Sequence, residues 1–142
     1  FKNLNLQYLF CYFGLIPFFF ILIDKYYFNQ IKEEIIINFL IYYSILVFVF
    51  IGSLNWNLKT KLKNYIIFYG FLPSLIGTFL IILNLYNYNS LILLLVLNLF
   101  LFAQLLLDYF IIYIDKFDKK IFYFIRLPLT IAIIILILLT IF

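Results

Sequence analysis

The stretch from Leu91 to Ile114 reads LILLLVLNLFLFAQLLLDYFIIYI and decides the fold. It carries one charged residue, Asp108, and exceeds the roughly 20 apolar residues that a helix needs to cross a bilayer. Its Leu, Ile and Phe side chains would also suit a strand. In lipid, however, a run of this length must satisfy its own backbone groups, which a helix does and a single strand does not. We therefore expect a transmembrane helix here.

Four further stretches resemble it in length and composition. The five predicted spans are Leu4 to Ile23, Ile35 to Leu54, Tyr65 to Tyr86, Leu91 to Ile114 and Ile121 to Phe142. The polar connections between them are Asp24 to Glu34, Asn55 to Asn64, Asn87 to Ser90 and Asp115 to Lys120. These connections are too short to cross a bilayer or to hold a further domain, so successive spans should be antiparallel. The sequence predicts an all-α membrane protein in which residues 1–142 form a single domain of five transmembrane helices.

Composition supports a lipid environment and excludes several functions. The chain is 68% apolar and 11% charged, against about half and a quarter in soluble domains. The net charge of +4 is scattered rather than gathered into a basic, aromatic-rich segment, so we expect no nucleic-acid partner. There is no His, which removes the commonest metal ligand, the usual haem ligand and the usual general base. We expect no catalytic residue, no metal and no cofactor.

The amino-acid bias points to an organellar gene. Phe, Tyr, Ile, Asn and Lys, whose codons are AT-rich, are abundant, whereas Gly, Ala, Arg and Pro, whose codons are GC-rich, are scarce. Many organellar genomes are AT-rich, and a product this hydrophobic would be hard to import. The chain contains no Met, so we expect its start to be processed, unconventional or truncated.

The lysines predict the orientation in the membrane. Seven lie on the side of the N-terminus, namely Lys2, Lys59, Lys61, Lys63, Lys116, Lys119 and Lys120, and two, Lys25 and Lys32, lie on the other. Positive residues are enriched on the cytoplasmic side of membrane proteins. We therefore expect the N-terminus in the mitochondrial matrix or the bacterial cytoplasm, and the C-terminus on the opposite side.

The fourth and fifth spans each carry one interior charge, Asp108 and Arg126. Their connection is centred near Phe117, nine residues from each, so antiparallel helices place both side chains about 10 Å below the membrane boundary. A lone charge at the centre of a membrane helix costs about 3 kcal/mol, so a carboxylate and a guanidinium at equal depth should pair. Gln104 lies one helical turn before Asp108 and should join them.

This pair has two interpretations. The favoured one is a structural ion pair that fixes the register of two helices, because the first three spans have no interior charge to continue a relay. The other is a proton or ion relay. Arg126 would alternatively meet a lipid phosphate or a carboxylate of a partner protein.

Glycine and proline mark the predicted bends. The steps Gly14-Leu15-Ile16-Pro17 and Gly70-Phe71-Leu72-Pro73 combine a residue that allows close helix approach with one that removes a backbone hydrogen bond. We expect kinked packing helices, the alternative being broken helices that line a transport site. Pro128 should free a carbonyl near Arg126.

The end of the second span combines small and interfacial residues. Gly52 should permit close helix contact, and Trp56 should anchor the span at the headgroups, the alternative for this segment being contact with a quinone or another cofactor. Three lysines that follow, Lys59, Lys61 and Lys63, are expected to touch anionic lipid headgroups.

Taken in order, these motifs resemble those of the transmembrane protein sixty-nine family, small five-span proteins of proteobacteria and mitochondria. The matching segments are Gly14 to Phe18, Phe50 to Trp56, Leu72 to Leu75, Gln104 to Asp108, and Tyr123 with Arg126, Leu129 and Thr130. Ser53 stands where the family has Gly, and Asn55 where it often has His or Arg. The resemblance implies a five-span fold in a mitochondrial inner membrane or a bacterial plasma membrane, and it brings no established activity.

The favoured function is that of a non-catalytic accessory or scaffold subunit of a mitochondrial inner-membrane complex, in particular one of the respiratory chain. Its partners would be membrane lipids and other transmembrane subunits. The alternatives are a small transporter or channel that uses Asp108 and Arg126, and a transient assembly factor.

Overall fold

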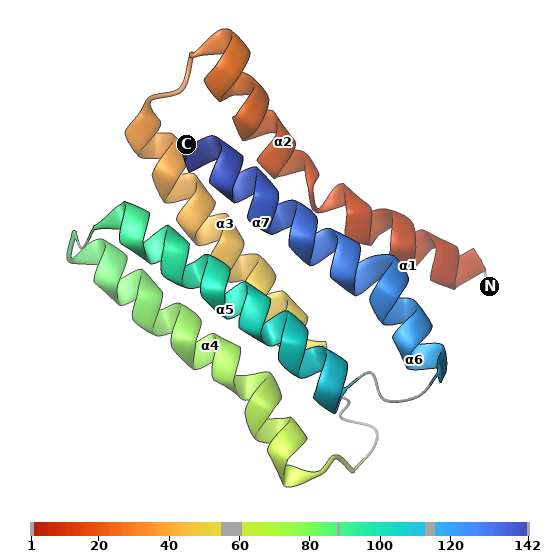
Figure 1. The fold of residues 1–142 in the computed structure, drawn as a ribbon. Coiled ribbons are helices and arrows are strands. Elements are labelled where there is room, and N and C mark those ends of the chain that lie inside the picture. Colours follow the sequence, from red (N-terminus) through yellow and green to blue (C-terminus); the bar gives the residue numbers. More distant parts are fainter. Residues whose placement is uncertain (1, 55–60, 88, 113–115, 142) are drawn as a thin grey trace. The chain divides into compact units, whose positions relative to one another are not determined.

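The structure, a computed structural model, describes residues 2–54, 61–87, 89–112 and 116–141. Figure 1 shows that these residues form helices joined by short connections, and they include no strand. The elements are the α-helices α1 (Lys2–Phe13), α2 (Ile16–Ile23), α3 (Glu33–Ser53), α4 (Asn64–Leu85), α5 (Ser90–Ile111), α6 (Lys116–Ile121) and α7 (Leu127–Ile141), and the π-helical turns η1 (Asp24–Phe28) and η2 (Phe122–Arg126).

Five helical segments are long and apolar enough to cross a membrane. They are Leu9–Phe28, Glu33–Ser53, Asn64–Leu85, Ser90–Ile111 and Phe122–Ile141. The predicted all-α fold with five membrane-length helices is confirmed, and the chain is a multi-pass membrane protein.

Two connections are more helical than expected. The first span continues past Ile23 through η1, and the chain then turns at Asn29, whose φ of 52° is in the left-handed region. The polar residues of η1 find partners within the protein, as described below, so the helix does not have to end where they begin. Likewise, part of the connection expected from Asp115 to Lys120 forms α6.

The two Gly-x-x-Pro steps have different structures. At the first, α1 ends at Phe13 and α2 begins at Ile16, and the N–H of Leu15 bonds the carbonyl of Tyr12 (3.1 Å), only three residues back. At the second, α4 continues through Pro73 without interruption. The same motif therefore interrupts one span and is accommodated inside another.

Close contacts divide the chain into two compact units. The terminal unit comprises Phe1–Ile36 and Asn98–Phe142, and the central unit comprises Ile37–Leu97. In the terminal unit α2 runs alongside α7 (Figure 1), and its core includes the fully buried Phe18, Leu101 and Ile137. In the central unit the core includes Leu40, Ile41 and Leu94.

The central unit brings α3 and α4 together through small residues. The buried residues of α4 follow an alternating spacing of three and four: Gly70, Pro73, Gly77, Leu80 and Asn84. A Cβ at Gly52 of α3 would lie 2.5 Å from Cγ of Pro73. A Cβ at Gly77 would lie 3.0 Å from Cγ2 of Ile45. Gly52 therefore permits an approach that a side chain would prevent, whereas a side chain at Gly77 would require the neighbouring methyl groups to shift by a few tenths of an ångström.

Gly52→Ala should destabilise the protein by about 1 to 3 kcal/mol, because the new methyl group would collide with a proline ring that is fixed to its backbone. Thermal unfolding in detergent measures the effect. Ser53→Ala is the matched control, since Ser53 is exposed and its hydroxyl bonds the carbonyl of Phe50 in its own helix. Equal stability of the two variants would contradict the close packing of Gly52 on Pro73.

Candidate functional site

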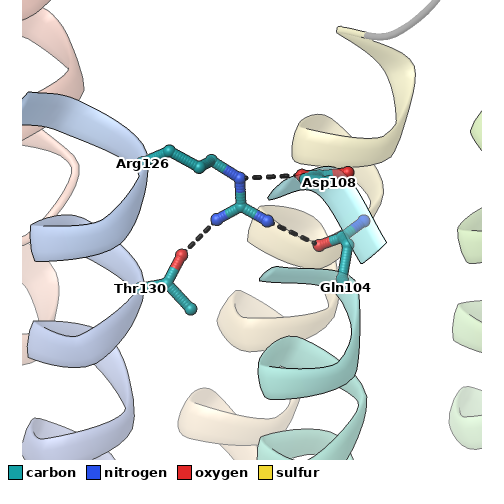
Figure 2. Close-up of polar contacts among 4 residues, drawn as sticks. All are labelled: Gln104, Asp108, Arg126 and Thr130. Atoms are coloured by element: carbon teal, nitrogen blue, oxygen red, sulfur yellow. Dashed lines mark hydrogen bonds and ion pairs between the residues drawn. The ribbon is translucent and has the colours of Figure 1, made fainter. Parts of the chain in front are cut away.

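A buried polar cluster joins α5 to the last span in the terminal unit (Figure 2). The Arg126 side chain donates from Nε to Oδ2 of Asp108 at 2.9 Å, and this is the one ion pair within the described residues. Its two terminal nitrogens donate to Oγ1 of Thr130 and, at 3.4 Å, to Oε1 of Gln104. The side chains of Arg126 and Asp108 are 8% and 1% exposed, so the pair is shielded from solvent and lipid.

Helical spacing positions these four residues. Gln104 and Asp108 are four residues apart on α5, and Arg126 and Thr130 are four residues apart across the junction of η2 and α7. Residues at this spacing share one face of a helix. Each helix therefore presents two polar side chains one turn apart. The Arg126 guanidinium bonds the two side chains of α5, Asp108 and Gln104, and also bonds Thr130 one turn further along its own helix.

Asp108 and Arg126 lie near the ends of their membrane-length helical segments. Asp108 is three residues before the end of its span at Ile111, and Arg126 is four residues after the start of its span at Phe122. These offsets correspond to about 5 Å along each helix at 1.5 Å per residue. They are similar, three and four residues, because Asp108 and Arg126 are each nine residues from Phe117. An arginine at this depth is able to extend to the headgroups, yet Arg126 turns inward to Asp108.

Each guanidinium nitrogen therefore has a partner within the chain. In hydrocarbon an unpaired charge or donor is costly, whereas charge-assisted bonds with good geometry offset that cost. The cluster can fix the register of α5 against the last span. Sequence reasoning found Asp108, Arg126 and Gln104 and missed Thr130 as a member, although its spacing from Arg126 was a usable signal.

Pro128 has the expected consequence for a nearby carbonyl. In an α-helix the N–H of residue 128 would bond the carbonyl of Phe124, but proline has no N–H. The hydroxyl of Tyr12 in α1 donates to that carbonyl instead, at 2.5 Å. The π-helical turn beside Arg126 is thus bonded to the first span just before its interruption at Gly14.

A second set of polar contacts joins the other end of α7 to the first span. The last four carbonyls of a helix have no partner within it. The Lys25 ammonium donates to the carbonyl of Thr140, and the Tyr26 hydroxyl donates to that of Leu139 at 2.8 Å. A cation at a helix C-terminus is also favoured by the helix dipole. The buried Asp24 carboxylate accepts the N–H of Ile31 at 3.1 Å, which stabilises the turn that follows η1.

The described lysines of the second connection are exposed to the surroundings of the protein. Lys61 and Lys63 are exposed, and the Lys63 ammonium lies 6.0 Å from the centroid of the Tyr65 ring, as suits residues near headgroups. Trp56 and Lys59 lie outside the described residues. Across the described parts of the chain, no three His, Cys, Asp or Glu residues are grouped as metal ligands would be.

No family model matches the chain, and neither a curated protein nor a solved structure matches it. The resemblance to the transmembrane protein sixty-nine family thus stays a prediction from the sequence motifs.

Arg126→Ala should destabilise the protein by about 3 kcal/mol, because it leaves the Asp108 carboxylate buried without its cation. The double variant Arg126→Ala with Asp108→Ala should lose less stability, since neither charge remains. Thermal unfolding of wild type, both single variants and the double variant in detergent gives the interaction energy of the pair as a double-mutant cycle. A double variant at least as unstable as Arg126→Ala would rule out an energetic role for the pairing.

Tyr12→Phe should destabilise by about 0.6 to 1.5 kcal/mol, the range for hydrogen bonds between membrane helices. In a Pro128→Ala background the effect should shrink, because the alanine N–H supplies the carbonyl of Phe124 with a bond of its own. The same unfolding measurement tests this. An undiminished effect of Tyr12→Phe in that background would mean that the hydroxyl does not compensate for the proline.

Proposed function

We propose that this protein is a non-catalytic accessory subunit of a mitochondrial inner-membrane complex of the respiratory chain. The observation that carries the proposal is that every guanidinium nitrogen of the buried cluster already has a partner within the chain. Arg126 uses Nε and both terminal nitrogens on Asp108, Gln104 and Thr130, so its charge is committed to holding two spans together. A scaffold subunit needs helices fixed in this way, whereas a transporter needs polar side chains that exchange partners during transport.

Two features of the sequence support the location. The AT-rich amino-acid bias fits organellar coding, which is common for subunits of respiratory complexes. The seven lysines on the side of the N-terminus against two on the other support a matrix-facing N-terminus. Membership of the transmembrane protein sixty-nine family is part of the same proposal.

Native electrophoresis of mildly solubilised source membranes tests the subunit role. The chain should migrate with a large complex that contains other transmembrane subunits. The variant Asp108→Leu with Arg126→Met should still assemble, because apolar side chains of similar volume often replace a buried ion pair without loss of stability. Arg126→Ala alone should reduce assembly. Wild-type protein that migrates only as a free small protein would refute the proposal.

A small transporter or channel is the second candidate, and one observation favours it. The amide of Asn98 is buried, and its nitrogen and oxygen have no hydrogen-bond partner among the described residues. It precedes Gln104 by six residues and Asp108 by ten, which places all three within one third of the circumference of α5. A path for protons or ions would use such a polar stripe.

Flux measurements in liposomes separate these two functions. A transporter should lose its flux in the variant Asp108→Leu with Arg126→Met, which removes both charges, whereas a scaffold should keep its assembly. A transient assembly factor, the third candidate, would be substoichiometric in the mature complex.

A further inference from the structure

Three donor groups gather at one membrane boundary of the terminal unit, apart from the buried cluster. The Lys119 ammonium of α6 lies 4.2 Å from the centroid of the Tyr109 ring of α5. The Tyr123 hydroxyl donates to the Tyr109 hydroxyl at 3.5 Å. Hydroxyl groups in a strong hydrogen bond lie about 2.7 to 2.8 Å apart, so the Tyr109 proton is not used in this contact, and the Tyr123 hydroxyl is held weakly enough to turn to a third group.

Aromatic packing holds these donors in place. The Tyr109 ring is 5.2 Å from that of Phe122 and 6.2 Å from that of Tyr123, with the ring planes inclined in both pairs. Inclined and edge-to-face arrangements are favourable for aromatic rings. The donors are thus oriented before any ligand arrives, which lowers the cost of binding.

The position of the three donors corresponds to the headgroup layer. Tyr109 is two residues before the end of one span and Tyr123 is one residue after the start of the next, while Lys119 lies between the spans. Phe110 and Phe124 are 73% and 60% exposed and lie next to the two tyrosines in sequence, within the spans. The Phe110 ring lies 5.2 Å from the Tyr109 ring, and Phe124 is one residue deeper in its span than Tyr123. A ligand held by the donors would therefore have exposed apolar side chains beside it.

The charge of this segment suits an anion with one negative charge. The connection from Asp115 to Lys120 contains three lysines and two aspartates, which leaves a net charge of +1. Lys25 provides a contrast, because its ammonium lies 5.7 Å from the Tyr26 ring but also donates to the carbonyl of Thr140. An ammonium has three N–H groups, and the Lys119 ammonium uses one of them on the Tyr109 hydroxyl rather than on a backbone carbonyl.

We propose that Lys119, Tyr109 and Tyr123 bind the headgroup phosphate of an anionic phospholipid. The ammonium and the two hydroxyls donate to the phosphate oxygens, and the acyl chains lie against the neighbouring phenylalanines. This site differs from the second connection, where lysines alone face the headgroups, because it combines a cation with two oriented hydroxyls. It does not depend on the role proposed above for the protein.

The test uses the full chain in phosphatidylcholine bilayers that contain spin-labelled phosphatidylglycerol or spin-labelled phosphatidylcholine. Electron paramagnetic resonance reports the fraction of each label immobilised at the protein. Wild type should prefer phosphatidylglycerol. Lys119→Gln should weaken that preference about fivefold, the effect expected for one lysine near a membrane surface. Tyr109→Phe with Tyr123→Phe should weaken it about threefold.

Lys119→Arg should keep the preference, and so should Lys32→Gln, which removes an exposed lysine from another connection. Circular dichroism shows whether each variant is folded, and the folded variants decide the outcome. Equal immobilisation of both labels by the wild type would overturn the proposal. So would an equal loss in Lys119→Gln and Lys32→Gln, which would indicate general attraction, or displacement of the lipid by inorganic phosphate, which would indicate a site for soluble anions.

Discussion

A polar group within hydrocarbon has no water to bond with, and the position of the last helix depends on this constraint. Lipid supplies no hydrophobic drive between helices, so the apolar side chains of α7 do not by themselves select a register. The polar groups on and beside α7 select its register. Arg126, just before α7, bonds Asp108 and Gln104 of α5, and the Lys25 ammonium bonds the carbonyl of Thr140 near its end. The hydroxyl of Tyr12 bonds a carbonyl that Pro128 leaves without a donor. The terminal unit is therefore held by directional bonds at both ends of one helix.

The central unit is built on a different principle. There Gly52 and Gly77 allow α3 and α4 to approach closely, and dispersion between the packed surfaces adds to one hydrogen bond, from the Asn84 amide to the Tyr42 hydroxyl at 3.0 Å. The Pro73 ring, which would be expected to weaken a helix, occupies the space that Gly52 leaves. Close packing at glycine thus contributes in the central unit, and a buried ion pair contributes in the terminal unit.

The sequence predicts some of these features better than others. Charges are so rare within the spans that Asp108 and Arg126 had almost no alternative partners, and the equal spacing about Phe117 was enough to pair them. The contacts of Lys25 and Tyr12 were not predictable in the same way. Their acceptors are backbone carbonyls more than 110 residues away, and any residue provides a carbonyl. For the same reason the first span was expected to end at Ile23, because the distant carbonyls that accept from Lys25 and Tyr26 do not show in the local pattern. Gly77 was missed although its spacing from Gly70 and Pro73 repeats along one face of α4.

The long separation of these contacts has a consequence for the order in which the chain is made. When the fourth span enters the bilayer, Asp108 is already synthesised but Arg126 is still eighteen residues from completion. Lys25 must wait for 115 further residues before the carbonyl of Thr140 exists. The first and fourth spans therefore enter the membrane before their polar partners in the helix that carries Arg126 and Thr140 exist. Until that helix leaves the ribosome, headgroups, water or the insertion machinery take the place of those partners.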